Sequence, residues 1–370
     1  MGLRTIVVDS DERLRDPAFV KAWQSLHHGS PMQSPAWLTT WWNVYGKAKP
    51  RKLCVAVVQD EHDKIVAVAP WYIHNQPLTG ATLRMLGDGE VCSDYATIAV
   101  IPERRRQATA ALADWLHQSA GKTWQKIHFA SIDLGDASIN ALAAHLRAFR
   151  FEPQRVPNVG CSLVSLPDSW ETYLSEISKN HRKRCRRWWR DYFETQRAKV
   201  VCAHEPAEIN EHWQTLVQLH CGRRRDKQGD TAFNHAEFYQ FHRQFIDLSI
   251  PTNLASLQTL FVDDKPVATE YLLLDADTVY CYQSGAVTRR HRDGYGNLSV
   301  LAVIRSAIEN GFRHVDFLRG EEAYKSHWNG KTQAAIDFVV RAKNIVGLVD
   351  GWFHQAIDQA RDIKSQLVGS

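Results

Sequence analysis

The spacing of apolar and polar positions changes period several times between residues 278 and 328. Residues 279–285 are rich in β-forming side chains, and residues 314–318 form a second such run. Between them, apolar side chains recur at intervals of three and four, which predicts a helix that ends near Gly311. The positions that carry this period are Leu298, Leu301, Ala302, Ile304 and Ile308. Strand, helix and strand within about forty residues predict a βαβ unit with parallel strands and a right-handed crossover.

The rest of the chain shows two series of strands and helices, and the second series begins near residue 160. The first series has predicted strands at 3–8, 52–59, 64–74, 83–86, 95–100 and 126–130, and helices at 17–28, 35–45, 104–120 and 136–149. The second adds strands at 162–165, 199–203, 254–262, 266–274 and 334–340, and helices at 170–177, 179–197, 206–221, 234–248 and 345–367. We therefore predict a mixed α/β fold in two domains, 1–160 and 161–370.

Composition narrows the function classes. A net charge of +4 in 370 residues is too small to indicate nucleic acid by itself. Seven scattered cysteines without a C-x-x-C pair fit a reducing compartment and give no sign of a disulfide frame or a zinc ribbon. The chain has no apolar window of membrane-spanning length and no signal-peptide core, so we expect a cytoplasmic protein. Neither H-E-x-x-H nor G-x-S-x-G occurs, which counts against metal catalysis and an α/β-hydrolase.

The first chemical signal is a pair of glycines at the start of the predicted helix. Gly294 and Gly296 let the backbone approach a ligand, and the free N–H groups of a helix start favour an anion such as a pyrophosphate. A plain turn would use the same glycines. The second strand ends at Asp316, and several polar residues follow, at the end of the sheet where open α/β folds hold their sites. These residues are Arg319, Glu321, Glu322, Tyr324 and Lys325.

Two motifs in this stretch resemble a known family. The run from His291 to Gly296, HRDGYG, resembles the Q/R-x-x-G-x-G/A pyrophosphate loop of GNAT-type acyltransferases. The run from Asp316 to Trp328, DFLRGEEAYKSHW, is similar to D-F-x-R-G-x-x-x-Y-K-x-x-W of the CelD-like branch, acetyltransferases associated with cellulose biosynthesis and related in architecture to the FemAB transferases. His291 departs from the motif, which has Gln or Arg there, so Arg290 and Arg292 are the candidates for the phosphate contact.

The resemblance implies two tandem GNAT-like domains, each a mostly antiparallel sheet with one parallel, splayed pair and flanking helices. Residues 1–160 would be a degenerate copy, because Arg104–Arg106 opens its helix in place of a glycine loop. Residues 161–370 would then hold acetyl-CoA or another acyl-CoA as co-substrate. The predicted cofactor-binding residues are Tyr282, Gln283, Arg290, Arg292, Gly294, Gly296 and Asn297. Tyr282 and Gln283 are neighbours on a strand, so the simple alternation places them on opposite faces.

Three residues are candidates for catalysis, and each has a structural alternative. Glu270 lies in an otherwise apolar strand and is either a general base or a member of a buried ion pair. Asp316 is either a base or an anchor that accepts N–H groups of the following turn. Tyr324 stands where many GNAT enzymes place the acid for the departing thiolate, and it is otherwise a packed aromatic.

The helix predicted at 179–197 is strongly basic. Arg182, Arg186 and Arg190 form one row, Lys179, Lys183 and Arg187 form the next, and His181, Cys185, Trp188 and Tyr192 form the inward stripe. The basic face is either simply solvated or attracts a polyanion such as a saccharide precursor, a lipid headgroup or tRNA. The predicted substrate-binding residues are Arg182, Arg186, Arg223, Asp94, Arg319 and Lys325; Lys325 would neutralise a phosphate or pair with Glu321.

The favoured hypothesis is an acyl-CoA-dependent N- or O-acyltransferase, an acetyltransferase in the first place. The acceptor attacks the thioester directly, and the resemblance implies a polysaccharide or cell-envelope precursor as acceptor. One alternative is a FemAB-like transferase that takes an amino acid from charged tRNA, although the intact Gly294 and Gly296 count against it. The other alternative is a non-catalytic scaffold that binds CoA. The oligomeric state stays open.

Overall fold

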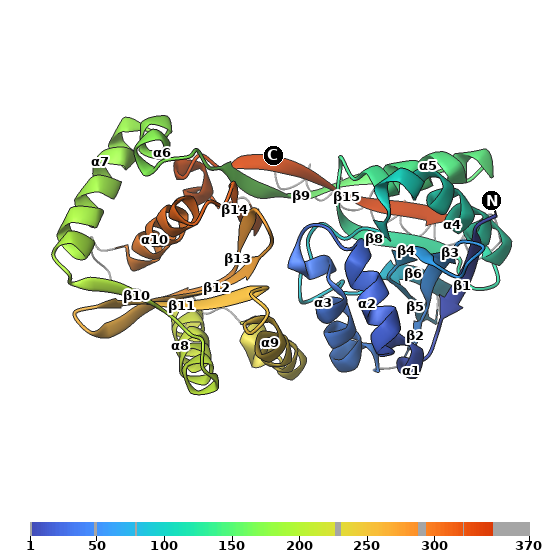
Figure 1. Cartoon of the computed structure of the whole chain (residues 1–370), viewed down its shortest axis with the longest axis horizontal. Coiled ribbons are helices and arrows are strands. Elements are labelled where there is room, and N and C mark those ends of the chain that lie inside the picture. Colours follow the sequence, from blue (N-terminus) through green and yellow to red (C-terminus); the bar gives the residue numbers. More distant parts are fainter. Residues whose placement is uncertain are drawn as a thin grey trace, which may run out of the picture. The chain divides into compact units, whose positions relative to one another are not determined.

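The computed structural model describes residues 2–47, 50–77, 80–225, 231–287, 294–320 and 322–342. The chain forms two compact units. Unit 1 contains the residues up to His28, Trp41–Asn158 and the described residues from Ala335, and unit 2 contains Gly29–Thr40 and Val159–Ala334. The units interleave along the chain, whereas the sequence analysis draws one boundary at residue 160 (Figure 1). The helix predicted at 345–367 lies outside the described residues.

Unit 1 is a mixed α/β unit. Its strands are β1 (Arg4–Val8), β2 (Arg51–Leu53), β3 (Val55–Gln59), β4 (Ile65–Ala69), β5 (Trp71–Gln76), β6 (Gly80–Met85), β7 (Ala99–Val100) and β8 (Lys126–Asp133). Its helices are α1 (Asp11–Leu14), α2 (Pro17–Leu26), α4 (Arg105–Ser119) and α5 (Ala137–Ala148). One sheet has the order β1-β3-β4-β7, and another runs β8-β6-β5-β2. Strands β6 and β8 are parallel, and the other pairs in these runs are antiparallel.

Unit 2 repeats this kind of architecture. Its strands are β10 (Ala198–Cys202), β11 (Ala255–Val262), β12 (Lys265–Leu274), β13 (Thr278–Ala286) and β14 (His314–Arg319). Its helices are α6 (Trp170–Glu176), α7 (Lys179–Trp188), α8 (Pro206–Arg225), α9 (Ala236–Ser249), α10 (Tyr295–Glu309) and α11 (Tyr324–His327). The sheet has the order β10-β11-β12-β13-β14-β9. Strands β9 (Gln154–Ser165) and β15 (Lys331–Arg341) each contribute residues to both units.

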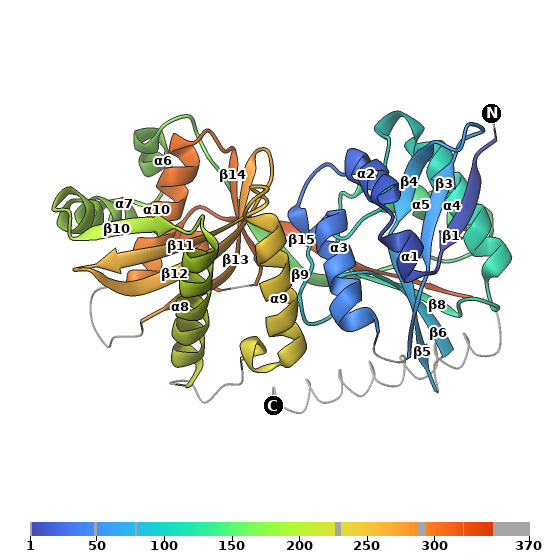
Figure 2. The same ribbon diagram turned by 60° about the horizontal axis from the view of Figure 1, so that its bottom comes forward.

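Helices cover both faces of the unit 2 sheet. Helices α6, α7 and α10 lie on one face, and α8 and α9 lie on the other (Figures 1 and 2). The core on the α10 face joins apolar side chains of α6, α7 and α10 to those of β12, β13 and β14. The alternating pattern in the strands and the three-to-four spacing in α10 produce these layers, as predicted. None of the described helices has the length and apolarity needed to cross a bilayer.

The structure differs locally from the predicted elements at three places. The helix from Pro35 is α-helical to Trp41 and then continues as a π-helical turn, η2 (Trp42–Gly46). The basic helix changes in the same way after Trp188, into η4 (Trp189–Glu194). The strand predicted at 95–100 is reduced to β7, because Tyr95 has a φ of 62° and cannot continue an extended strand.

Candidate active site

The parallel strands β13 and β14 separate after a short paired segment. They are paired at only three positions, from Thr278 opposite His314 to Tyr280 opposite Asp316. Beyond that point β13 continues to Ala286, whereas β14 shifts register against β9. The backbone N–H of Leu318 donates to Oδ1 of Asp316 at 2.7 Å, and Leu318 has a φ of 55°. This left-handed residue turns β14 aside and leaves the main-chain groups of β13 without a β14 partner beyond Tyr280.

Strand β13 carries a bulge at the point where the two strands separate. Leu272 on β12 is opposite Cys281, but Tyr271 is opposite Gln283, so Tyr282 is the extra residue. The Tyr282 ring lies 5.4 Å from the Tyr271 ring, and Gln283 shares the face of its partner Tyr271. The expectation that Tyr282 and Gln283 point to opposite faces is therefore wrong, because the bulge interrupts the simple alternation.

An aromatic cluster on the α8–α9 face supports this bulge. The Tyr282 hydroxyl is 3.2 Å from Nε2 of His242, a fully buried residue of α9. The Trp37 ring packs edge-on against Tyr282 at 5.3 Å and against Phe245 at 4.8 Å. Trp37 comes from residues 29–40, which belong to unit 2 although they precede most of unit 1 in the chain. The sequence analysis missed this support, because only the tertiary fold brings residue 37 to residue 282.

Helix α10 begins at Tyr295, beside the end of β13. Gly294 is the N-cap, its carbonyl accepts from Leu298 N at 3.0 Å, and among the described residues no side-chain hydrogen bond caps the helix start. A Cβ built on Gly296 would lie 3.7 Å from the Cβ of Ala286 on β13. The side-chain amide of Asn297 lies 3.0 Å from the Cβ position of Gly294. Gly294, Gly296 and Asn297 thus meet at one helix start, whereas Arg290 and Arg292 lie outside the described residues.

Two buried carboxylates lie on the strands beside β13, Glu270 on β12 opposite Ser284 and Asp316 on β14 opposite Tyr280. Glu270 and Asp316 are 4% and 1% exposed. Burial, and after it the charges of Glu270 and Asp316, raise the pKa of the Cys281 thiol well above its usual value. Both carboxylates are therefore close enough to Cys281 to act on it electrostatically. Ala268 and Leu272, each two residues from Glu270 on β12, belong to the core on the α10 face. Because residues two apart on a strand share a face, Glu270 also points toward the α10 face.

Tyr324 is the first residue of α11 and is partly open to solvent. Its side chain is 38% exposed, and its ring lies edge-on to that of Phe317 at 6.0 Å. Phe317 belongs to the core on the α10 face, so Tyr324 lies next to β14 on the same side. This position combines ring packing with access for the hydroxyl, which suits either of the two roles considered for Tyr324.

Lys325 holds the segment that links β14 to α11. Its amino group donates to the carbonyls of Leu318, Arg319 and Gly320 at 3.2, 2.9 and 3.3 Å, and it lies 2.9 Å from a carboxylate oxygen of Glu322. The Lys325 residue is 5% exposed. A Cβ on Gly320, whose φ is 130°, would come within 2.8 Å of this amino group, so a glycine is needed there. Glu321, the expected partner, lies outside the described residues.

We expect Lys325→Met to lower the free energy of unfolding by about 2–4 kcal/mol, because one buried and two partly buried carbonyls lose their donor. Urea denaturation followed by circular dichroism measures this change. Glu322→Gln is the matched control and should cost less than about 1 kcal/mol, since Glu322 is 58% exposed and the carbonyl bonds remain. Equal stability of Lys325→Met and the wild type would show that the amino group does not hold this segment.

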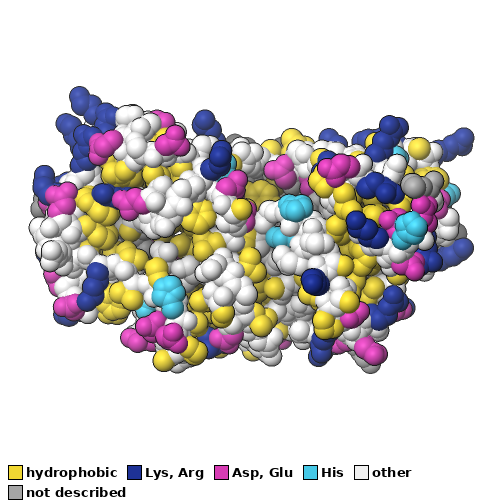
Figure 3. Space-filling view, in the orientation of Figure 1, with side chains coloured by type: hydrophobic (Ala, Val, Ile, Leu, Met, Phe, Trp, Pro, Cys, Tyr) yellow, Lys and Arg dark blue, Asp and Glu magenta, His cyan; other side chains and the backbone are white. Residues whose placement is uncertain are grey.

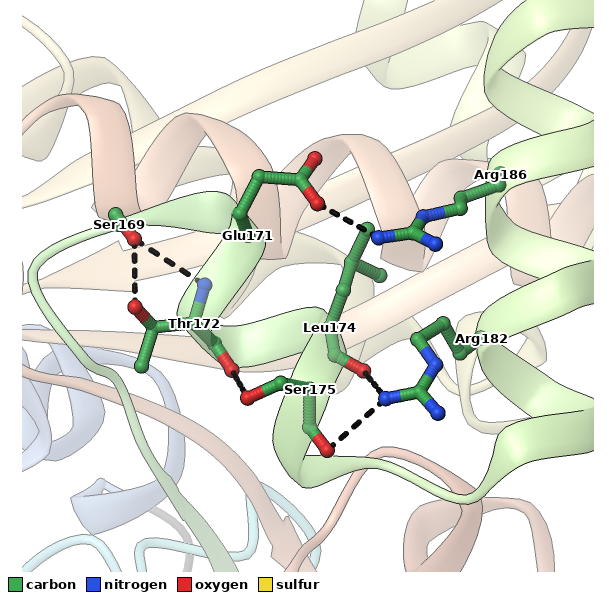
Figure 4. A network of polar contacts seen from close by, with 7 residues as sticks. All are labelled: Ser169, Glu171, Thr172, Leu174, Ser175, Arg182 and Arg186. Atoms are coloured by element: carbon green, nitrogen blue, oxygen red, sulfur yellow. Dashed lines mark hydrogen bonds and ion pairs between the residues drawn. The ribbon is translucent and has the colours of Figure 1, made fainter.

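The basic helix α7 packs as predicted from its spacing. His181, Cys185, Trp188 and Tyr192 are all buried. Lysine and arginine side chains gather over α7 on the outer side of unit 2 (Figure 3). Two of the arginines predicted to bind substrate contact α6 (Figure 4). Arg182 donates to the carbonyls of Leu174 and Ser175 at 3.3 and 3.2 Å, and Arg186 pairs with Glu171 at 2.7 Å.

We expect His181 to make stability depend on pH. Burial lowers the pKa of His181 from 6.5 to about 4, so the unfolded chain takes up the proton first as the pH falls. The neutral, buried His181 thus contributes to the free energy of unfolding. This contribution is complete above pH 6.5, and roughly 2–3 kcal/mol of it is lost between pH 6.5 and 4. Denaturation at pH 7, 5.5 and 4.5 should show a shallower pH dependence in His181→Phe than in wild type. His62→Gln, at a side chain that is 83% exposed, should keep the wild-type slope, and an unchanged slope in His181→Phe would refute the assignment.

The remaining predicted substrate residues are dispersed. Arg319 ends β14, opposite Cys161 of β9, and is half-buried. Asp94 is buried in unit 1, in the loop that contains Tyr95. Arg223 lies in α8, and its side chain is outside the described part. The catalytic candidates, in contrast, lie on β12, β14 and α11, and the described glycine-loop candidates lie at the α10 N-terminus. Among the described residues, no group of three or more His, Cys, Asp or Glu side chains could hold a metal ion.

The comparison with protein families identifies one domain. Residues 179–326 match the acetyltransferase (GNAT) domain. The match begins with the first residue of α7 and ends within α11, so it includes β13, α10, β14 and the glycine loop. No curated protein matches the sequence. The narrower resemblance to the CelD-like branch stays a prediction.

Solved structures show the same fold over most of the chain. FemX aligns with a TM-score of 0.63 at 11% identity and covers 91% of this chain and 96% of its own. L-PGS from Bacillus licheniformis gives 0.52 at 11% identity, with coverages of 89% and 92%. A tandem GNAT protein from the clavulanic acid biosynthesis pathway gives 0.50 at 14% identity, with coverages of 93% and 99%. At sequence identities this low, the alignments compare the fold alone. They confirm the mixed α/β architecture of tandem GNAT type.

Proposed function

We propose that unit 2 transfers an acyl group from acyl-CoA, most simply acetyl-CoA, to an amine or hydroxyl. The proposal starts from the match of residues 179–326 to the acetyltransferase (GNAT) domain. One observation carries this proposal: the parallel pair β13–β14 separates after three positions, beside a bulge and an uncapped helix start. This arrangement leaves one edge of β13 without β14 beyond Tyr280 and places a helix N-terminus, which favours anions, at the end of that strand.

The donor would bind along β13. Beyond Tyr280 that strand has no β14 partner, so the amides of the pantetheine arm would bond to main-chain groups of Tyr280–Ser284 like an added strand, except at the Ser284 carbonyl, which lies 2.9 Å from Nδ1 of His220. The pyrophosphate would rest on the first-turn N–H groups of α10, where Gly296 leaves space next to Ala286. Tyr282 would contribute its main chain only, since its side chain packs against Trp37 and His242 on the α8–α9 face.

The acceptor nitrogen or oxygen would attack the thioester carbonyl carbon directly. A backbone N–H near the β13 bulge would stabilise the negative charge on the carbonyl oxygen. Glu270 would take the proton of the acceptor. The C–S bond then breaks, and the Tyr324 hydroxyl would protonate the departing thiolate. Asp316 fits the role of anchor better than that of base, because its Oδ1 already accepts the N–H of Leu318.

The acceptor would be a polysaccharide or cell-envelope precursor in the cytoplasm, as the CelD-like resemblance implies. Arg319, the last residue of β14, and Lys325, which donates to the Arg319 carbonyl, are the predicted substrate contacts on this side of unit 2. Asp94, another predicted substrate contact, belongs to unit 1. The same proposal treats unit 1 as a degenerate copy of the fold that shapes substrate binding.

A second candidate is FemAB-like transfer of an amino acid from charged tRNA. The fold likeness to FemX and the basic helix α7 favour it. The glycine-containing start of α10, at Gly294 and Gly296, favours acyl-CoA, because tRNA-dependent transfer has no need for a pyrophosphate site. A scaffold that binds CoA without turnover would also use the α10 site. Its CoA affinity would not change when Glu270 or Tyr324 is substituted, and it would have no turnover to lose.

The role of Tyr324 is tested by Tyr324→Phe. The variant keeps the ring against Phe317 and removes only the hydroxyl. We expect turnover of acetyl-CoA to fall by about 10- to 100-fold, with unchanged acetyl-CoA affinity, because the thiolate then leaves without a positioned acid. Steady-state thiol release and calorimetric titration measure the two quantities. Wild-type turnover in Tyr324→Phe would remove this residue from the mechanism.

A further inference from the structure

We propose that the exposed face of α7 docks the protein reversibly on an anionic lipid surface. Helix α7 contains no acidic residue. Lys179, Lys183, Arg184 and Arg187 are exposed on it, and Arg186 and Arg190 extend the same side. At 100° per residue these six cations cover less than half of the helix circumference, and they form what we call the α7 basic face.

Most cations of the α7 basic face have no carboxylate partner among the described residues. Some arginines and lysines elsewhere do have one, as in Arg197–Asp263, Arg305–Glu309 and Lys199–Asp264. Within the α7 basic face, Arg186 pairs with Glu171 and Arg190 with its neighbour Asp191. Lys179, Lys183, Arg184 and Arg187 take part in no described ion pair, so their charge is open to an external partner.

This concentration of like charge weakens the helix that carries it. Lys179, Lys183 and Arg187 are spaced at four residues, and like charges at this spacing on a helix repel each other and destabilise it. The positive end of the helix dipole adds to the repulsion at Lys179. Nothing in the packing of α7 requires these side chains, since its buried contacts come from His181, Cys185 and Trp188. A partner that neutralises the charge would account for an arrangement that costs stability in the isolated protein.

A planar surface fits the α7 basic face better than RNA does. The opposite side of α7 is buried in the core of unit 2, so the helix cannot enter a nucleic-acid groove and reach both walls. Single strands are bound through exposed aromatic faces. Here Trp188 is buried and Trp189 is covered by Arg305, whose guanidinium carbon lies 3.7 Å from the ring centroid. Figure 3 shows the lysine and arginine side chains projecting outward over α7, as contact with a flat anionic layer requires.

The test uses the full chain and lipid vesicles in a sedimentation assay. Vesicles of phosphatidylcholine are compared with vesicles that also contain phosphatidylglycerol, at low and at physiological salt. We expect binding only with phosphatidylglycerol, and weaker binding as salt is added. The double variant Lys183→Glu/Arg187→Glu should lower the partition coefficient about 30-fold or more. Lys21→Glu/Lys122→Glu makes the same change in net charge at exposed lysines of unit 1 and should keep most of the binding.

Three results would overturn the proposal: equal binding to both kinds of vesicle, equal loss in both double variants, or displacement from phosphatidylglycerol vesicles by low concentrations of structured RNA. The last result would assign the α7 basic face to RNA. Circular dichroism and thermal melting of each variant show whether it is folded. The outcome is independent of acyl transfer, because Lys183 and Arg187 lie outside the catalytic candidates.

Discussion

Glu270→Gln is expected to lower the rate of acyl transfer by about 10²- to 10⁴-fold, while acetyl-CoA affinity stays within about twofold of wild type. Glutamine has the size and the acceptor oxygen of glutamate but cannot take a proton at neutral pH. Glu270 is 4% exposed and lies on β12 opposite Ser284, within the β13 segment that is free of β14. A proton acceptor at that place is next to the proposed thioester, so its loss should affect the chemical step rather than binding.

Asp316→Asn is the matched comparison for Glu270→Gln. The asparagine Oδ1 can still accept the Leu318 N–H that Asp316 accepts at 2.7 Å, so the turn of β14 should survive. We expect this variant to lose less than about tenfold in rate. Stopped-flow measurement of a single turnover separates chemistry from product release. A Glu270→Gln enzyme with more than half of the wild-type rate would exclude Glu270 as the base, and a larger loss in Asp316→Asn would transfer that role to Asp316.

Gly296→Val is expected to weaken acetyl-CoA binding by at least about 100-fold. The Cβ position of Gly296 lies 3.7 Å from the Cβ of Ala286, in ordinary contact, and among the described residues outside its own helix turn no other heavy atom comes within 4 Å. The helix start therefore tolerates a side chain, but valine would fill the space above the first-turn N–H groups where the pyrophosphate would rest. Calorimetric titration of the variant measures the loss directly.

Gly296→Ala provides the control for this substitution. Alanine has a higher helix propensity than glycine, so α10 should gain about 0.5–1 kcal/mol in stability. A smaller loss of affinity in Gly296→Ala than in Gly296→Val, with both proteins folded, would attribute the effect to space at the helix start. Full acetyl-CoA affinity in Gly296→Val would contradict the assignment of the anion site to α10.

The sequence predicts the elements of unit 2 well, because each depends on a local signal. The spacing of apolar residues defines α10, and the turn before Lys265 defines the β11–β12 hairpin. The parallel pairing of β13 with β14 follows from the βαβ pattern. Neither the π-helical turn η4 nor the short length of β7 has such a signal, because each depends on how the chain packs around it.

The sequence predicts the candidate site less well than it predicts these elements. Glu270 lies opposite Ser284 of β13, Asp316 lies opposite Tyr280, and Gly296 at the start of α10 lies beside Ala286, so the candidates are spread along β13 rather than placed at one point, and their shared role stays a prediction. The bulge at Tyr282 has no local signature, so the faces of Tyr282 and Gln283 were wrongly predicted. The contacts of Lys325 depend on the left-handed Leu318, which brings three carbonyls toward one amino group. Such contacts follow from the tertiary fold and cannot be read from residue spacing.

The most direct test of acyl-CoA-dependent transfer is calorimetric titration of the full chain with acetyl-CoA, with uncharged tRNA as the comparison ligand. The account predicts one acetyl-CoA site with a Kd in the micromolar range, absent in Gly296→Val, and weaker and strongly salt-dependent heat with tRNA. No heat with acetyl-CoA or with longer acyl-CoA, together with saturable tRNA binding, would contradict the account and favour transfer from charged tRNA.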